Sequence, residues 1–415
     1  MKILYVSSLC SDTYFQHIYE NSRIKPQQQA QKFHSLLSKG LMDLKQNLYV
    51  LSRPPTQQLN KKLKNIKTKE SNFNESNSFV TYNHLKIVNF SMFKHIYLFI
   101  TCFFNALQWN FKNRKYERAI ISDPLNLSVS MAALLIAKIF KVKSTAIITD
   151  IPAYMEYTTI KKESFPRKLF LNCYSGICNF FMQRYDSYIF LTEQMNDLIN
   201  PSNRPYVVIE GLVDVNMRNT PNILEDKYKE KIVIYAGALY EKYGVKKLLQ
   251  AFMALKESNT KLWIYGAGEM EEYIKKCEIE DNRIKFFGVM PNEHIVNEQL
   301  KATVLVNPRP SYEEFTKYSF PSKNMEYMVS GTPVLTTPLQ GMPYEYNDYV
   351  YLFEDETLAG ITRTLENILG KKREELHEKG VKAKEFVIRE KNNQIQANKI
   401  ICLIKSSKQA RLQIN

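Results

Sequence analysis

Short apolar runs alternate with longer segments of helical periodicity along most of the chain. In the first half, each run is six or seven residues long and rich in Ile, Val and Tyr, which is typical of strands buried in a sheet. We predict such strands at 2–8, 47–52, 118–123, 144–150 and 187–192. Helix-length segments at 27–41 and 127–140 separate several of them. This alternation predicts a parallel sheet wrapped by helices.

A second series of the same kind begins at residue 206. We predict its strands at 206–210, 231–237, 261–268, 283–288, 302–308, 332–337 and 350–353, with helices such as 244–258 and 270–279 between them. The chain has 415 residues, too many for one ordinary core. We therefore predict two α/β domains at 1–206 and 207–371. A charged helical segment at 372–415, without strands, can pack back on the first domain.

One long stretch, residues 54–80, breaks the pattern because it is polar and rich in Lys and Asn. We expect it to be a surface loop or a poorly ordered excursion.

The positive charge of the chain is concentrated in the first half. The net charge is +15, and residues 1–215 hold 27 Lys and Arg against 15 Asp and Glu, a balance of +12. This suggests a phospholipid surface, a phosphorylated substrate or nucleic acid as partner, although lysines that only aid solubility are the alternative. No nucleic-acid module is recognisable in the basic stretches, so we expect no nucleic-acid partner.

Cysteine and histidine spacing gives no sign of a metal site. The six cysteines include no CxxC and the six histidines show no ligand spacing, so we expect buried free thiols in a reducing compartment and no metal. The start, MKILYVSSLC, is too short for a signal peptide, and the apolar runs 95–111 and 169–181 fall short of the roughly 20 residues that span a bilayer. These features predict a cytoplasmic protein.

The stretch YSFPSKNMEYMVSGTPV, residues 318–334, carries the most specific chemistry. Pro321 suits the first turn of a helix, and a helix N-terminus offers free N–H groups to a phosphate. Ser322 adds a hydroxyl and Lys323 a full charge, so together they predict a diphosphate site. Glu326 follows about one turn later, and its carboxylate can accept two hydrogen bonds from a ribose. An ordinary amphipathic helix with a capping serine is the alternative.

Glycines follow two of the predicted strands in the second half. Gly266 and Gly268 end the run LWIYGAG, where they would let the backbone approach a ligand closely. Gly237 and Gly244 flank another strand-to-helix connection. As a dinucleotide fingerprint this pattern is weak, since no acidic residue follows at the required spacing.

The second half resembles the C-terminal half of a glycosyltransferase family 4 enzyme with the two-domain, Rossmann-like GT-B fold. The resemblance rests on six blocks in the same order: VIEGLVD, YAGALYEKYGVKKLLQAF, LWIYGAGEMEEYI, IKFFGVM, ATVLVNPRP and FPSKNMEYMVSGTPVLTT. The first half fits more loosely, through its strand order and RYDSYIFLTEQM. The resemblance implies transfer of a sugar from a nucleotide donor, UDP- or GDP-linked, with retention and without a metal or other cofactor. It also implies that the donor lies mainly on the C-terminal domain, across a cleft from an acceptor on the N-terminal one.

The resemblance also implies roles for individual residues. Ser322 and Lys323 would meet the diphosphate, Glu326 would hold the ribose, and Gly237 would lie under the phosphates. Residues 287–289, with Phe287 and Val289 at their ends, would lie near the base.

The chain departs from the family pattern at several of these positions. Tyr318 stands where the first glutamate of a pair is usual, and Glu313 or Glu314 would have to substitute. Ala238 replaces an arginine, and Tyr243 replaces a lysine for which the neighbouring Lys242 would assist.

The reaction as implied needs no dedicated base, because an oxygen of the leaving phosphate can take the proton of the acceptor. If a base exists, Asp150 and Asp123 are the candidates, because each ends a strand of the first domain. Each is equally well explained as a cap of a turn or helix.

The acceptor implied by the resemblance is a lipid-linked oligosaccharide or another glycan. The segment 85–118 joins an aromatic-rich helix to the basic residues Lys112, Arg114, Lys115 and Arg118, as interfacial helices do. A core helix with a solvated basic turn is the alternative. We therefore expect a hexosyltransferase-type enzyme of capsule, exopolysaccharide or lipopolysaccharide synthesis, peripheral on the inner face of the plasma membrane. A nucleotide-sugar epimerase or hydrolase, and a non-catalytic nucleotide-sugar-binding partner of another transferase, remain alternatives.

Overall fold

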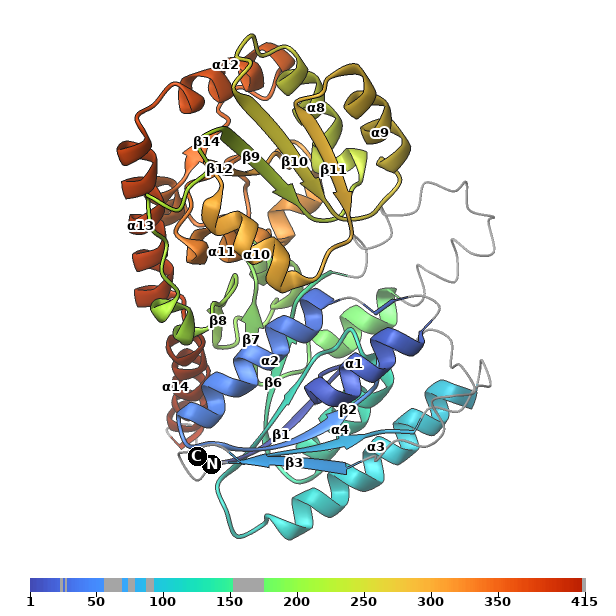
Figure 1. The fold of residues 1–415 in the computed structure, drawn as a ribbon. Coiled ribbons are helices and arrows are strands. Elements are labelled where there is room, and N and C mark those ends of the chain that lie inside the picture. The colour runs from blue at the N-terminus through green and yellow to red at the C-terminus, as the bar shows by residue number, and fades with distance from the viewer. Residues whose placement is uncertain are drawn as a thin grey trace. The chain divides into compact units, whose positions relative to one another are not determined.

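The computed structural model describes residues 1–22, 25–26, 28–55, 69–73, 79–86, 93–151 and 175–412. The chain divides into two compact units (Figure 1). Unit 1 comprises Met1–Leu212 with Asn393–Asn415, and unit 2 comprises Val213–Asn392. The predicted domain limits at 206 and 371 differ from these boundaries, and the predicted helical segment 372–415 is divided between the units.

Unit 1 contains an eight-stranded sheet of order β3-β4-β2-β1-β5-β6-β7-β8. The strands are β1 Lys2–Ser7, β2 Asn47–Ser52, β3 Lys69–Phe73, β4 Phe79–His84, β5 Arg118–Ser122, β6 Lys143–Ile148, β7 Ser187–Phe190 and β8 Tyr206–Val208. All neighbours pair in parallel except β3 and β4, which are antiparallel. The five strands predicted for the first half are all present.

Two expectations about this sheet were wrong. Tyr206–Val208, assigned to the second series, pairs with β7 and therefore ends the first sheet. Residues 69–73, assigned to a loop, form β3, because pairing with β4 satisfies the backbone of a polar edge strand. The rest of the polar stretch, 56–68 and 74–78, lies outside the described residues.

Helices cover both faces of the first sheet. They are α1 Asp12–Asn21, α2 Gln28–Asp43, α3 Phe93–Lys112, α4 Leu127–Ile139, α7 Met195–Ile199 and α14 Asn393–Leu412. α2 and α14 pack together over one apolar cluster, and α3 and α4 over another. The strands β1, β5 and β6 are almost wholly buried between these layers, which explains why they read as continuous apolar runs.

Unit 2 contains a six-stranded parallel sheet of order β11-β10-β9-β12-β13-β14. The strands are β9 Lys231–Ala236, β10 Thr260–Tyr265, β11 Ile284–Gly288, β12 Val304–Asn307, β13 Val334–Thr336 and β14 Tyr351–Leu352. Each coincides with a run that the sequence pattern predicted, although β10 begins one residue before the predicted run 261–268.

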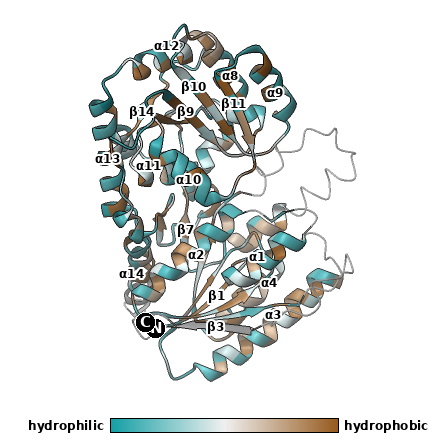
Figure 2. Cartoon of the chain, in the orientation of Figure 1, coloured by the Kyte–Doolittle hydropathy of each residue, from teal (hydrophilic) through white to brown (hydrophobic). Residues whose placement is uncertain are grey.

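The second sheet is also covered on both faces. Its helices are α8 Val245–Met253, α9 Glu271–Glu280, α10 Asn292–Lys301, α11 Ser322–Ser330, α12 Leu358–Leu369 and α13 Arg373–Glu390. One cluster gathers apolar residues of α8, α9 and α12, and the other those of α11 and α13. Figure 2 shows hydrophobic residues along the strands and more hydrophilic ones on the outer helices, as expected for a covered parallel sheet.

The cysteines of the described residues are free. Cys10, Cys102, Cys178 and Cys277 are buried, as expected, whereas Cys402 is exposed.

Candidate active site

The loops that follow β9, β10, β11 and β12 meet at one edge of the second sheet, because parallel strands all end on the same side. The short helix α11 starts at this edge, between β12 and β13. Pro321 is its N-cap residue and makes no side-chain capping bond, and Ser322, the first helical residue, is exposed. The N-terminus of α11 therefore offers backbone donors and a partial positive charge.

Two buried side chains fix α11 against the sheet. The hydroxyl of Tyr327 accepts a hydrogen bond from the backbone N–H of Ala236 at 2.8 Å and lies 3.2 Å from its carbonyl oxygen. Asn324 accepts from Asn307 at 2.8 Å and donates to Thr336 at 3.3 Å. The N-terminal turn of α11 is thus held rigidly beside the ends of β9 and β12.

Lys323 extends from this turn into the loop after β9. Its Nζ donates to the hydroxyl of Tyr235 at 3.2 Å and lies 4.4 Å from the centre of that ring. Burial, and after it the positive charge of Arg309, lower the pKa of Lys323 to about 7, whereas the charge of Glu326 acts in the opposite direction. An ammonium held in such surroundings gains from an anionic ligand that restores its charge balance.

The glycines after β9 and β10 allow the loops and Lys323 to come together. A Cβ on Gly237 would lie 1.2 Å from Nζ of Lys323. Gly266 has a φ of +132°, and a Cβ there would lie 1.8 Å from the carbonyl oxygen of Gly237. A Cβ on Gly268 would lie 2.4 Å from the carbonyl oxygen of Leu239. Gly266 and Gly268 thus permit the loop after β10 to pack closely on the loop after β9. Lys323 lies against Gly237 of this packed pair of loops.

Arg309 lies close enough to act on the charge of Lys323, and Lys242 lies close to Arg309. The guanidinium of Arg309, just after β12, packs over the rings of Tyr243 and Phe315 at 4.8 and 5.6 Å and donates to Ser319 at 3.1 Å. Lys242 lies 5.2 Å from the ring of Tyr243, and burial and the charge of Arg309 lower its pKa.

Lys242 was predicted from the sequence as a donor residue, whereas Arg309 was not. Its position directly after an apolar strand, in VNPRP, was the available signal, since such residues lie at the carboxyl edge of the sheet.

The predicted ribose ligand Glu326 lies on α11, one turn beyond Lys323. Its side chain is half-buried and accepts a hydrogen bond from Gln299 of α10 at 3.4 Å. Its charge also acts on Lys323, so the two side chains belong to one site.

The remaining predicted donor residues surround this group. The ring of Phe287 stacks on that of Tyr265 with 4.8 Å between their centres, and the backbone of Phe287 lies at the end of β11. Val289 is exposed. Tyr318 and Glu314 lie at the two ends of a 3-10 turn before α11, with Glu314 exposed. The carboxylates whose charges act on Lys242 are those of Glu269 and Glu313.

The candidate bases lie in unit 1, at the ends of β5 and β6. Asp123 is almost fully buried and accepts hydrogen bonds from the N–H of Leu125 and the amide of Asn126 at 3.0 and 2.8 Å. It also lies 3.5 Å from His34. These contacts are those of a structural turn, as the alternative interpretation expected. Asp150, the second residue after β6, is half-buried.

The basic residues proposed for the membrane lie at the end of α3. Lys112, Arg114 and Lys115 are exposed, and Arg118 is half-buried at the start of β5. None of the helices in the described ranges is long and apolar enough to cross a membrane.

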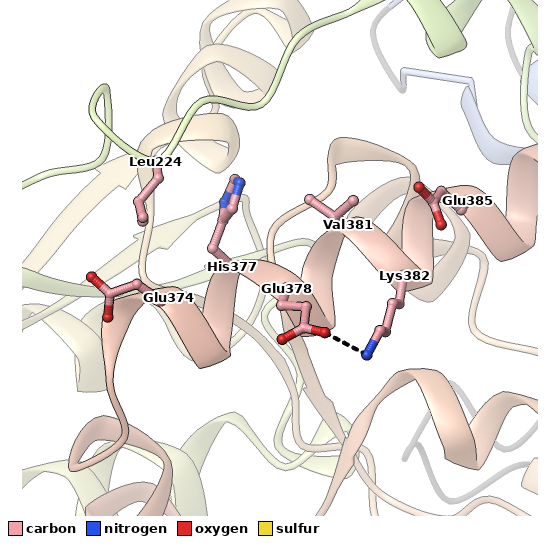
Figure 3. A pocket seen from close by; sticks show the side chains of 7 residues that line it. All are labelled: Leu224, Glu374, His377, Glu378, Val381, Lys382 and Glu385. Atoms are coloured by element: carbon pink, nitrogen blue, oxygen red, sulfur yellow. Dashed lines mark ion pairs between the residues drawn. The ribbon is translucent and has the colours of Figure 1, made fainter.

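A separate pocket lies along α13, lined by Leu224, Glu374, His377, Glu378, Val381, Lys382 and Glu385 (Figure 3). The ion pair between Glu378 and Lys382 spans one turn of that helix. None of these residues belongs to α11 or to the loops after β9 to β12. Across the part of the chain that the structure describes, no group of three or more His, Cys, Asp and Glu side chains is placed to hold a metal ion.

Comparisons with known proteins agree with this architecture. Residues 216–386 match the family model described as "Glycosyl transferases group 1". A search of curated protein sequences gave no match.

Several solved structures share the fold over nearly the whole chain. Sucrose-phosphate synthase from Thermosynechococcus elongatus has a TM-score of 0.65 at 14% identity, covering 99% of this chain and 100% of that one. A glycosyltransferase from Rickettsia africae has a TM-score of 0.61 at 14% identity, with 98% of each chain covered. Anabaena Alr3699/HepE in complex with UDP and glucose has a TM-score of 0.58 at 12% identity, covering 98% and 100%.

The match and the two Rossmann-like units define the architecture. The chain has the GT-B fold of these solved structures, and its residues 216–386 match the model of group 1 glycosyltransferases. This confirms the fold that the sequence indicated, and the family match covers most of the part of the chain that carried the resemblance.

Proposed function

We propose that this protein transfers a sugar from a nucleotide-diphosphate donor to a lipid-linked or glycan acceptor, with retention, in the synthesis of a surface polysaccharide. The observation that carries the proposal is the position of Lys323. Its ammonium lies beside the N-terminus of α11, above Gly237 and within the field of Arg309. This arrangement suits the two phosphates of a nucleotide sugar, because backbone donors and full charges converge on one small volume.

The roles of the site residues follow from the charge that develops on the donor during the transfer. When the bond between the anomeric carbon and the phosphate oxygen breaks, negative charge collects on the leaving diphosphate. Lys323 and the N–H groups of α11 stabilise that charge, and Arg309 adds to their field. The acceptor hydroxyl attacks from the face that the diphosphate leaves, and its proton passes to an oxygen of the departing phosphate. No metal or other cofactor takes part in this scheme.

Glu326 and the loop after β11 hold the rest of the donor. The carboxylate of Glu326 takes the two ribose hydroxyls, and the backbone at 287–289 meets the base. UDP or GDP is the carrier we propose, and the complex of Anabaena Alr3699/HepE with UDP supports UDP as the first to test.

An apolar stripe on α3 supports a lipid-bound acceptor. The exposed residues of this stripe are Phe93, Ile96, Ile100, Phe104 and Phe111. At 100° per residue, their spacing places all of them on one side of the helix. Figure 2 shows hydrophobic residues along α3. With Lys112, Arg114 and Lys115 after it, the helix has the composition of an interfacial anchor at an anionic membrane.

A panel of UDP- and GDP-sugars, each with and without a lipid-linked acceptor, tests the proposal. Nucleotide release that depends on the acceptor is the expected result, and Lys323→Ala and Glu326→Ala should each abolish it with little change in melting temperature. Conversion of the donor without an acceptor would instead show an epimerase or hydrolase. Saturable binding without turnover would show a non-catalytic partner, and turnover that survives both substitutions would contradict the site.

A further inference from the structure

A buried amide on α10 contacts the side chain that we propose as the ribose ligand. The side chain of Gln299 is fully buried, and its Nε2 donates to Oε1 of Glu326 at 3.4 Å. The other polar atom of the amide, Oε1 of Gln299, is also buried and has no hydrogen-bond partner among the described residues. Within that part of the chain, the contact with Glu326 is therefore the one hydrogen bond that this side chain makes.

Gln299 occupies a position on α10 that an apolar residue would normally fill. Ile295, four residues earlier, and Ala302, directly after the helix, pack on the apolar cluster that also contains residues of α11. Residues at this spacing lie on one face of a helix. A buried amide with an unpaired oxygen destabilises the folded state relative to an apolar side chain of the same size. A polar group kept at such a cost calls for a functional explanation.

The backbone at Gln299 is fixed to the segment that follows α11. The hydroxyl of Thr332, two residues after α11, donates to the carbonyl oxygen of Gln299 at 2.7 Å. The same hydroxyl accepts hydrogen bonds from Lys227 at 2.7 Å and from Asn222 at 3.1 Å. The amide of Gln299 thus extends from a backbone that is tied to the end of α11, the helix that carries Glu326.

A hydrogen bond to one carboxylate oxygen restrains the plane of the whole carboxylate. Two neighbouring ribose hydroxyls can donate to both oxygens of Glu326 together only if that plane faces them. A neutral amide restrains the carboxylate without neutralising it, whereas a lysine or arginine at residue 299 would form an ion pair and compete with the ribose. Gln299 is therefore suited to orienting a carboxylate that has to stay available to a ligand.

We propose that Gln299 is a positioning residue, which orients Glu326 so that the site selects a ribonucleotide donor over a 2′-deoxyribonucleotide one. The inference rests on the proposed function and deepens it, because it restricts the class of donor. Sugars linked to UDP or GDP are accepted, and sugars linked to dTDP are discriminated against. Gln299 acts on the donor only through the carboxylate of Glu326.

Calorimetric titration of the full-length protein with UDP, 2′-deoxy-UDP and 2′,3′-dideoxy-UDP tests this role. The guanosine series is titrated in parallel, and the comparison uses the base that binds more tightly. The wild type should bind the ribonucleotide about tenfold more tightly than its 2′-deoxy form. Gln299→Met keeps the length of the side chain but removes the donor, so affinity for the ribonucleotide should fall about fivefold or more and the preference should shrink. The dideoxy form has no hydroxyl for Glu326 and should bind both proteins equally.

Thermal unfolding separates this role from a purely structural one. Gln299→Met also removes the unpaired buried oxygen, so its melting temperature should equal or exceed that of the wild type. The matched control is Gln396 of α14, in unit 1. It is also fully buried with an unpartnered Oε1, but its Nε2 donates to the backbone carbonyl of Gly211 at 3.0 Å. Gln396→Met should leave all three affinities unchanged.

Two results would overturn the role of Gln299. One is an unchanged preference for the ribonucleotide in Gln299→Met, and the other is a lower melting temperature of this variant with equal losses of affinity for all three nucleotides. Glu326→Ala tells this failure from failure of the proposed function. If Glu326→Ala abolishes the preference and Gln299→Met keeps it, only the positioning role fails. A wild type without any preference would show that the ribose lies away from Glu326, and the proposed placement of the donor would fail as well.

Discussion

The ammonium of Lys323 occupies the space that a side chain on Gly237 would need. A Cβ at Gly237 would lie 1.2 Å from Nζ and 1.9 Å from Cε of Lys323. The glycine and the lysine come from different strand-to-helix connections, and the lysine can occupy its position only because residue 237 has no side chain. The pair explains why a glycine stands after β9 without invoking an unusual backbone angle.

Gly237→Ala should therefore impair donor binding more than folding. The atoms nearest to the added methyl belong to the flexible end of Lys323, so the melting temperature should stay within a few degrees of wild type, but the displaced ammonium should lower UDP affinity by about tenfold or more. Calorimetry and thermal unfolding measure the two effects. Gly176→Ala is the control, because a Cβ there would contact nothing within 4 Å. An unchanged UDP affinity in Gly237→Ala would contradict the placement of the phosphates.

Donor binding should depend on pH through Lys323. Its pKa is about 7 in the free protein, and a bound diphosphate favours the charged form. UDP affinity should thus fall as the pH rises above 7, approaching tenfold per unit, with proton uptake on binding. Titrations in two buffers of different ionisation enthalpy measure that uptake. Lys323→Arg keeps its charge throughout this range and should remove the dependence. A wild-type affinity that does not change between pH 7 and 9 would refute this assignment.

Arg309 should lower the pKa of Lys323 and also contribute its own charge to donor binding. Arg309→Gln removes a repulsive neighbour, so the pKa of Lys323 should rise and the fall in UDP affinity should begin at higher pH. At pH 7, affinity should still decrease by several-fold, because one cation of the site is lost. Arg309→Lys, which keeps the charge but loses the planar packing on Tyr243 and Phe315, should shift the pH dependence less. Identical pH profiles for Arg309→Gln and wild type would show that the two charges are not coupled.

The stripe on α3 should decide membrane association. Ile100→Ser/Phe104→Ser removes apolar area that would enter the interface, and we expect partitioning onto vesicles of phosphatidylglycerol and phosphatidylcholine to fall about tenfold or more. Flotation measures the bound fraction. Ile279→Ser changes a strongly exposed isoleucine on α9 and serves as control. Equal binding of the stripe variant and the control would exclude this surface as the anchor.

A buried lysine outside the site should make stability depend on pH. Lys227 donates to the carbonyl of Ala302 and to Thr332 at 3.1 and 2.7 Å, and burial lowers its pKa to about 7. Because its unfolded pKa is higher, the unfolded chain binds more protons above pH 7, and the free energy of unfolding should rise with pH from 7 to about 9.5. Lys227→Met should flatten this rise, as measured by urea unfolding at several pH values. A slope identical to wild type would mean that Lys227 stays charged in the folded protein.

The sequence by itself determined the order of most strands and helices along the chain and the chemistry of the helix at Pro321. Buried strands of a parallel sheet are continuous apolar runs, so β1, β9 and β12 could be located from hydrophobicity alone. Ser322, Lys323 and Glu326 lie on one short helix, so their spacing already implied a common site.

Only the tertiary structure decided contacts between segments distant in the chain. β8 could not be assigned to the first sheet from its sequence, because its pairing with β7 is a long-range choice that no local pattern encodes. In the same way, Arg309 lies near Lys323 only because parallel strands bring their carboxyl ends to one edge. Arg53, which follows β2, and His95 of α3 likewise both reach the N-terminus of α4 at such an edge. The break between α13 and α14 at 391–392, which sends the two helices to different units, follows from which core each apolar face can cover. Apolar periodicity is a local property of the chain, whereas the convergence of charges is a property of the folded sheet.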